Sequence, residues 1–239
     1  MISIAATTVT FPASAFVPLA VGFFGLGTGY LIYGPEELFG LPHRSRSVDL
    51  TTGLWGIWMP GFMQFLTGVY LWVGLLWFHS FRAPTLYMAA LAFTAFGVHW
   101  FSLGLSRMLG SDPRPNEFMA VPFCLLSALG TVVFFKAGDW PVGLLFVGLI
   151  CVYVSEFFAS MFMLPRPHTT AEPTRLNVFG ERALGFFRLL TGSWLMYLTF
   201  AATLNAASGT HLSLQGPAEP APLFEAFGLP MIFPPSRRP

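Results

Sequence analysis

The sequence predicts an all-α membrane protein, a bundle of six transmembrane helices. Only 10% of its 239 residues are charged, whereas a soluble domain carries about 25%. So few charges cannot cover a surface that faces water. Hydrophobic residues make up 54% and aromatic residues 17% of the chain. This composition is typical of surfaces that face lipid and the membrane interfaces.

Six apolar runs, each long enough to cross a bilayer as a helix, alternate with short polar or proline-containing linkers. The predicted spans cover residues 16–33, 50–78, 85–105, 117–135, 140–163 and 182–205. They form one transmembrane domain between an N-terminal segment, residues 1–15, and a C-terminal tail, residues 206–239. The even number of spans predicts that both termini lie on the same side of the membrane.

The first predicted span ends where Pro35 follows Gly34. Proline lacks a backbone N–H and its ring clashes with the preceding helical turn, so we expect it to stop the helix. Within the span, Gly25 and Gly29 lie four residues apart. Small residues at this spacing allow a neighbouring helix to approach closely, and a packing contact is expected there.

The second predicted span is unusually long, at ~40 Å if it is fully helical. Pro60, followed by Gly61, is expected to kink it. Gln64 lies near its middle, where a primary amide in hydrocarbon needs a hydrogen-bond partner or a wet cavity. A hydrogen bond to another helix and a place on a transport pathway are both compatible with Gln64.

The third predicted span is the least uniform of the six. Thr94, Gly97 and His99 interrupt an apolar sequence. A lipid-facing helix needs none of these residues, whereas a helix that packs closely on its neighbours or lines a pathway can use all three. His99 is either a packing histidine that donates one hydrogen bond or a proton carrier.

The fourth predicted span leads through a tight turn into the fifth, which is followed by the sixth. Glu156 in the fifth and Arg188 in the sixth lie at similar depth, because the two helices are antiparallel neighbours. An ion pair between them would offset the cost of burying either charge. Alternatively, each side chain reaches the interface separately. A paired Arg188 could also attract an anionic substrate.

The C-terminal tail contains seven prolines between positions 217 and 239. Proline at this density prevents a packed α-helix. The tail also contains apolar residues, and we expect it to lie along the membrane interface or on a neighbouring subunit. The predicted partners are therefore the lipid bilayer and either further copies of this chain or other subunits of a membrane complex.

Several classes of function are not expected. The formal net charge of +1 offers no basic surface for nucleic acid. The five histidines do not fall at metal-ligand spacing, and Cys124 and Cys151 lie in apolar runs where a packing role is favoured. No phosphate-binding loop, Ser-His-Asp arrangement or pair of catalytic carboxylates is recognisable. We therefore predict no enzyme activity, no cofactor and no metal site.

The basic residues are distributed unequally between the two sides of the predicted bundle. The first, third and fifth loops carry seven arginines, whereas the opposite side has only Arg82 and Lys136 near the spans. The positive-inside rule places the seven arginines in the cytoplasm and both termini outside.

Four segments in order carry motifs that occur together in one family. They are Pro18-Leu-Ala-Val-Gly-Phe-Phe-Gly25, Gln64-Phe-Leu-Thr-Gly68, Phe93-Thr-Ala-Phe-Gly-x-x-Trp100 and, in the sixth span, Gly185, Gly192, Tyr197, Leu198, Leu204 and Asn205. Through them the chain resembles the acetate/succinate uptake transporter family of six-helix membrane proteins, over about residues 16 to 205.

The resemblance implies a hexamer in which each bundle surrounds its own pore, and proton-coupled transport of acetate, succinate or a related small carboxylate. By motif position it implies an apolar constriction at Phe24, Phe96 and Leu149, with Gln64 as the polar residue of the pathway. It also implies that the termini are cytoplasmic, opposite to the arginine distribution. Further polar candidates for the pathway are Thr94, His99, Glu156 and Arg188.

The chain departs from the family pattern at several positions. Its opening motif lacks the family's Asn and first Pro, Phe96 replaces a tyrosine, His99 replaces a bulky aromatic residue, and Arg188 replaces a small one. We predict a channel or secondary transporter for a small carboxylate in a bacterial-type inner membrane. The alternative is a non-transporting structural or accessory subunit of a larger membrane complex that reuses the fold.

Overall fold

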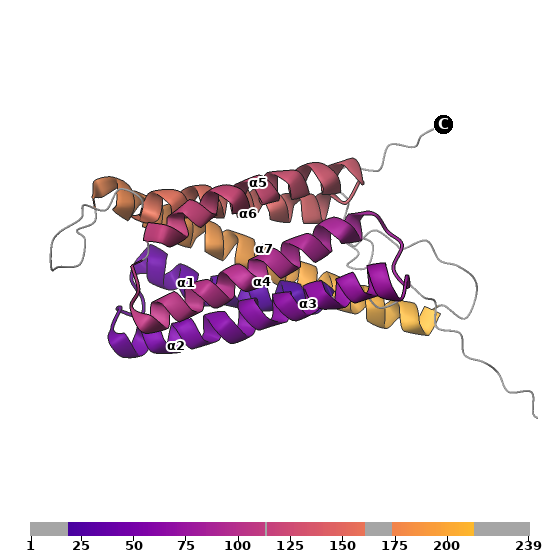
Figure 1. Ribbon diagram of the computed structural model, residues 1–239, viewed down its shortest axis with the longest axis horizontal. Coiled ribbons are helices and arrows are strands. Elements are labelled where there is room, and N and C mark those ends of the chain that lie inside the picture. The colour runs from indigo at the N-terminus through magenta and orange to yellow at the C-terminus, as the bar shows by residue number, and fades with distance from the viewer. Residues whose placement is uncertain (1–18, 113, 161–173, 213–239) are drawn as a thin grey trace, which may run out of the picture.

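The structure, a computed structural model, describes residues 19–112, 114–160 and 174–212. In this part of the chain the regular structure is entirely helical, with no strand. The helices run close to one common axis and form an elongated bundle (Figure 1). The predicted all-α class is therefore confirmed.

The chain begins its described part with α1 (Leu19–Phe39). A continuous helical run follows, made of α2 (Arg46–Gly56), the π-helical segment η1 (Ile57–Phe62), α3 (Met63–Trp72) and a second π-helical segment, η2 (Val73–Trp77). The remaining helices are α4 (Thr85–Leu109), α5 (Arg114–Lys136), α6 (Trp140–Ser160) and α7 (Arg175–Leu212). The predicted N-terminal segment and residues 213–239 of the predicted tail lie outside the described residues.

Four helical runs in the described residues are long and apolar enough to cross a membrane. They are Arg46–Trp77, Thr85–Leu109, Phe118–Lys136 and Trp140–Ala159, and they correspond to the second to fifth predicted spans. Their outer faces expose large apolar side chains such as Trp77, Phe118 and Leu125. Such a surface favours contact with lipid over contact with water.

α1 continues through Pro35, where the sequence analysis predicts its end. The helix ends only before Gly40, which has a left-handed backbone with φ 69°. The prediction is wrong because tertiary contacts hold the last turn. Glu36 and Glu37 form ion pairs with arginines of α4 and α7, and these contacts offset the ~3 kcal/mol that an interior proline costs a helix.

Pro60 lies inside the continuous helical run, within η1. The sequence analysis predicts a kink at this position, and the structure has a π-helical turn there. A π-turn is a common way for a helix to absorb a residue that cannot donate its backbone hydrogen bond. At this turn the Pro60 carbonyl accepts a hydrogen bond from the Gln64 side chain.

α7 begins earlier and ends later than the predicted sixth span, so residues 175–181 and 206–212 are helical. A cap at its start explains the earlier beginning. The Asn177 backbone N–H donates to Thr174 Oγ1, and the Thr174 N–H donates to Asn177 Oδ1 at 2.9 Å. Asn177 Nδ2 also donates to the Phe158 carbonyl at 3.1 Å, which ties α7 to the end of α6.

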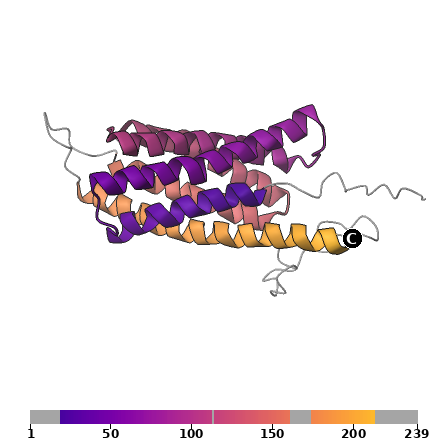
Figure 2. The same ribbon diagram turned by 90° about the horizontal axis from the view of Figure 1, so that it is seen from below.

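α1 lies along α7, α4 packs on α2 and α3, and α5 packs on α6. Figure 2 shows α1 directly beside α7 along one side of the bundle. Glycines make this approach close, since Gly27 lies against Gly192, and Gly34 against Gly185. A Cβ added at Gly185 would lie 2.5 Å from the backbone nitrogen of Leu38.

The packing contact predicted at Gly25 and Gly29 is confirmed. A Cβ at Gly25 would lie 2.5 Å from the Met59 carbonyl oxygen, and one at Gly29 would lie 2.6 Å from Pro60 Cγ. These two glycines therefore let α1 approach the backbone of η1.

α4 has two buried faces with different roles. Thr94 and Gly97 face α3, where Gly68 lies against Thr94 and the Phe65 backbone lies against Gly97. Phe96 belongs to the buried aromatic core on the side of α5 and α6. The unusual residues of the third predicted span are thus divided between helix packing and the interior of the bundle.

Candidate functional site

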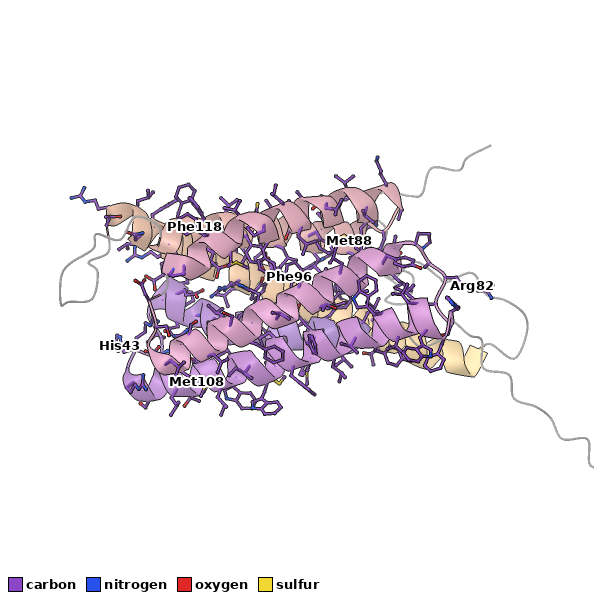
Figure 3. The ribbon with its side chains drawn as sticks, viewed as in Figure 1. His43, Arg82, Met88, Phe96, Met108 and Phe118 are labelled. Carbon is purple, nitrogen blue, oxygen red and sulfur yellow. The ribbon has the colours of Figure 1, made fainter. Side chains whose placement is uncertain are left out.

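Glu36, near the end of α1, is the centre of one group of ion pairs. It pairs with Arg107 of α4 and with Arg44, whose Nε lies 3.2 Å from Glu36 Oε1. Arg107 Nε also donates to Asp49 Oδ1 of α2 at 3.0 Å. These four residues, the Glu36 group, join three helices at the end of the bundle where Figure 3 labels His43.

Arg188 of α7 is the centre of a second group. Its guanidinium pairs with Glu37 of α1 and with Glu156 of α6, whose Oε1 lies 3.3 Å from Arg188 Nη2. The arginine side chain is only 3% exposed. Of the two alternatives that the sequence leaves open for Glu156 and Arg188, the structure has the ion pair, and Glu37 completes what we call the Arg188 group.

Glu37 is a residue that the sequence analysis misses, because the expected end of α1 at Pro35 places it in a polar loop. Tyr30, Tyr33 and Glu37 recur at intervals of three and four residues. This spacing puts them on one face of a helix, and it is the signal that could have revealed the buried glutamate. In the structure both tyrosines are 1% exposed.

Aromatic rings surround the Arg188 guanidinium. Its central carbon lies 5.9 Å from the Tyr30 ring centroid, 5.6 Å from that of Tyr33 and 5.7 Å from that of Trp100. At these distances the ring faces attract a cation. The rings also exclude water, so the charges of the Arg188 group must be neutralised by one another.

His99 of α4 lies beside the Arg188 group. Its Nε2 is 4.0 Å from Glu156 Oε1, and its ring centroid is 4.7 Å from that of Phe123 and 5.8 Å from that of Tyr153. The side chain is 6% exposed. A protonated His99 would form an ion pair with Glu156, whereas a neutral His99 packs against the two rings.

A cavity of about 90 Å³ lies in the interior and is lined by Gln64, Phe96 and Leu149, three of the residues predicted for the pathway. Its wall is otherwise apolar except for Thr85 and Asp139. The volume exceeds the ~10–15 Å³ that a single water molecule needs. The cavity therefore has room for a small organic molecule.

Gln64 is fully buried, and its Nε2 donates to the Pro60 carbonyl of its own helical run at 3.0 Å. Its Oε1 has no hydrogen-bond partner among the described residues. The amide therefore satisfies a carbonyl next to the π-turn and not a neighbouring helix. Gln64 thus lines an apolar cavity and keeps one buried acceptor without a partner among the described residues.

Asp139 marks the end of the cavity that lies away from the two ion-pair groups. Its Oδ1 accepts a hydrogen bond from the Val142 N–H at 3.3 Å at the start of α6. Burial raises the pKa of Asp139 above its ordinary value, and the Val142 hydrogen bond opposes this shift. Leu19 and Thr85, the first residues of α1 and α4, line the same end.

A stack of aromatic rings lies between the cavity and the Arg188 group. Phe96, labelled midway along α4 in Figure 3, packs against Phe123 at 5.5 Å and against Tyr153 at 5.9 Å between ring centroids. Phe96 lines the cavity, and His99 follows it after about one helical turn. Phe123 and Tyr153 contact both Phe96, which lines the cavity, and His99, which lies beside Glu156.

Phe24 and Thr94, which are also predicted for the pathway, lie elsewhere. Phe24 is 42% exposed on the outside of the chain, and the adjacent Phe23, 4% exposed, lines the cavity in its place. Thr94 donates to the Ala90 carbonyl and accepts from Trp72 Nε1 at 3.1 Å. Phe24 and Thr94 therefore do not line this cavity, and their place on a pathway stays a prediction.

The described residues contain no group of three or more His, Cys, Asp or Glu side chains arranged to hold a metal ion. Cys124 and Cys151 are free and half-buried.

Comparisons with protein families, with curated proteins and with solved structures find no match to this chain. The motif resemblance described above thus gains no support from them. The function must be argued from the geometry of the cavity and of the two ion-pair groups.

Proposed function

We propose that this chain is a multi-pass membrane protein with six spans, in which α1 and α7 join the four helical runs apolar enough to cross a membrane. α1 has 21 residues, a length of ~30 Å that matches the hydrocarbon core of a bilayer. α7 packs along it. Arg188, the charge farthest along α7, is paired inside the bundle, which is where membrane helices tolerate charges.

We further propose that the bundle moves a small carboxylic acid, as a channel or as a secondary transporter coupled to protons. The observation that carries this proposal is the apolar cavity lined by Gln64, a buried amide whose Oε1 has no hydrogen-bond partner among the described residues. A protonated carboxylic acid combines a short apolar body with one O–H donor. It therefore complements both the wall and the amide.

The charges of the described residues also favour the neutral acid over its anion. A carboxylate anion inside an apolar cavity needs a cation, yet Arg107 and Arg188 are both engaged by carboxylates of the chain.

Uptake of labelled acetate and succinate into proteoliposomes, with and without a pH gradient, tests this proposal. Protein-free liposomes must be the baseline, because neutral acetic acid crosses lipid unaided. We expect protein-dependent acetate uptake that increases when the lumen is alkaline. Gln64→Leu should reduce it about tenfold, the equivalent of one lost hydrogen bond. Absence of protein-dependent flux for any small acid would overturn the proposal.

A structural role remains the second candidate, and the exposure of α5 favours it. Only 28% of its most apolar window is buried, against 44–56% for the other three membrane-length runs. A groove of about 240 Å³ lined by Cys124 and Phe157 opens between α5 and α6. Lipid, further copies of the chain in a hexamer or unrelated subunits could cover this face.

Purification in a mild detergent separates these outcomes. A homo-oligomer of this chain, measured by light scattering, supports transport by an assembly of identical bundles. Stoichiometric co-purification of unrelated membrane subunits, together with absent acid flux, supports the structural role.

A further inference from the structure

The charges of the Arg188 group do not balance. Two carboxylates, Glu37 and Glu156, share one guanidinium, so the group carries a net charge of −1 if both are ionised. The neighbouring Glu36 group is neutral, since Arg44 and Arg107 offset Glu36 and Asp49. It therefore lends no net positive charge to the Arg188 group.

Within residues 19–112, 114–160 and 174–212, the other groups that face Arg188, Glu37 and Glu156 do not correct the imbalance. From α1 they are Tyr30, Tyr33 and Glu36, from α4 His99 and Arg107, from α6 Tyr153, and from α7 Glu181. The tyrosines are neutral, Arg107 is already paired, and Glu181 adds negative charge. Among the described residues, His99 is the one such neighbour that gains positive charge on protonation, and its Nε2 lies 4.0 Å from Glu156 Oε1.

In the part of the chain that the structure describes, one oxygen of each carboxylate also lacks a hydrogen-bond donor. Glu156 Oε2 and Glu37 Oε2 are both buried and have no hydrogen-bond partner among the described residues. The Glu156 side chain is 5% exposed. An ionised carboxylate with a buried, unpartnered oxygen is unfavourable, whereas a protonated carboxyl group is neutral at that oxygen.

We propose that the Arg188 group is a proton-binding site in which Glu37 and Glu156 hold one exchangeable proton between them, with Arg188 as the fixed countercharge. Binding adds one proton to a carboxylate oxygen and breaks no other bond. The protonated group then has one carboxylate, one carboxylic acid and one guanidinium, and its net charge is zero.

The place of the site connects it to the cavity and to water. His99 lies next to Glu156 and about one helical turn from Phe96, which lines the cavity. On the other side, Glu37 is 12% exposed and adjoins the Glu36 group, in which the Arg44 side chain is 59% exposed. A proton can therefore reach the site from the aqueous end of the bundle. Its coupling to acid movement rests on the proposed function, but its binding does not.

Infrared difference spectroscopy of the purified protein in detergent tests the site. The measurement compares neutral with alkaline pH, a range in which an ordinary glutamate is ionised. We expect the wild type to lose one protonated-carboxyl band as the pH rises. Glu156→Gln and Glu37→Gln should each abolish this band, because either change leaves Arg188 with a single carboxylate and a neutral group.

Two control variants test which carboxyl groups give rise to the infrared band. Glu181→Gln removes a nearby carboxylate that is outside the group and should leave the band unchanged. Asp139→Asn identifies any contribution from the buried aspartate at the far end of the cavity. Circular dichroism and gel filtration confirm folding, and the two glutamine variants provide independent readings should one fail to fold.

A wild-type spectrum without a protonated-carboxyl band at neutral pH would overturn the proposal, as would a band that survives in both glutamine variants. The spectra require no transport. A band that behaves as expected in a protein without acid flux refutes the transport proposal and leaves the proton site standing. Acid flux in a protein without the band refutes the proton site and leaves the transport proposal standing.

Discussion

A single guanidinium, that of Arg188, connects three helices through Glu37 and Glu156. The residue is 3% exposed and is surrounded by aromatic rings. Removing one partner of a buried ion pair destabilises the fold by more than the intact pair stabilises it, because the other charge stays buried without a countercharge. Arg188 is therefore the residue at which a substitution separates an electrostatic role from simple packing.

Replacement of Arg188 by Gln should destabilise the protein by ~3–5 kcal/mol, because two buried carboxylates lose their common countercharge. Thermal unfolding in detergent measures the effect. Glu156→Gln is the matched control, and its loss should be smaller, at ~1–3 kcal/mol, since Arg188 keeps Glu37. Equal losses in the two variants would show that the charge balance does not govern stability here.

Phe23 and Phe24 are adjacent residues on different faces of α1, and they make a matched pair for testing the pathway. Phe23 lines the cavity, whereas Phe24 is 42% exposed. Phe23→Ala should enlarge the cavity and change protein-dependent acetate uptake several-fold, while Phe24→Ala should leave the uptake of a single bundle near the wild-type value. The reverse result, measured in proteoliposomes, would restore Phe24 to the constriction and place the pathway outside this cavity.

At the scale of the elements, the contact between α1 and α7 depends on small residues. The glycine pairs Gly27 with Gly192 and Gly34 with Gly185 are each seven residues apart along their helices, which keeps both on one face. Between them, Tyr30 faces α7, where its Cβ would lie 3.0 Å from a Cβ added at Gly192. The close approach brings Glu37 of α1 within reach of Arg188 of α7.

Gly185→Ala should lower the stability by about 1–3 kcal/mol, because the added methyl group meets the Leu38 backbone nitrogen at 2.5 Å and α7 must move away. It should also weaken the Glu37–Arg188 ion pair, which the infrared band reports. Ser193→Ala, on the exposed face of the same helix, is the control and should change the stability by less than about 0.5 kcal/mol. Unchanged thermal unfolding of the Gly185 variant would mean that the two helices are farther apart.

At the level of the whole molecule, polar groups are concentrated at the end that carries His43 and the two ion-pair groups. The opposite end carries Arg82 (Figure 3). Arg46–Trp77, the helical run between the two loops, has 32 residues and is ~48 Å long. That length is sufficient to separate the two ends by a full bilayer.

His43→Cys and Arg82→Cys, each in a background with Cys124 and Cys151 replaced by Ser, should react with an impermeant thiol reagent from opposite sides of the membrane. Labelling of intact cells and of inverted vesicles measures this. The side on which position 43 reacts also decides between the arginine distribution, which places it in the cytoplasm, and the family resemblance, which places it outside. Labelling of both positions from one side would contradict the proposed topology.

The class of the fold and the four membrane-length runs could be predicted from composition and apolar run length alone. These properties depend on the solvent around each segment, and a segment with almost no charge cannot remain in water. The similar depth of Glu156 and Arg188 could also be predicted, because the two helices are antiparallel neighbours in sequence, but whether the two side chains pair was left open. A helix-packing contact at Gly25 and Gly29 could likewise be predicted, since small residues four apart allow a neighbouring helix to approach closely.

Other features were decided by contacts between segments that are distant in sequence. Local rules end α1 at Pro35, but ion pairs from α4 and α7 extend it and bury Glu37. The choice between Phe23 and Phe24 at the cavity depends on the rotation of α1 about its axis, which the glycine contact with α7 sets. The sequence thus specifies which residues leave water, whereas the packing of the helices specifies which of them meet.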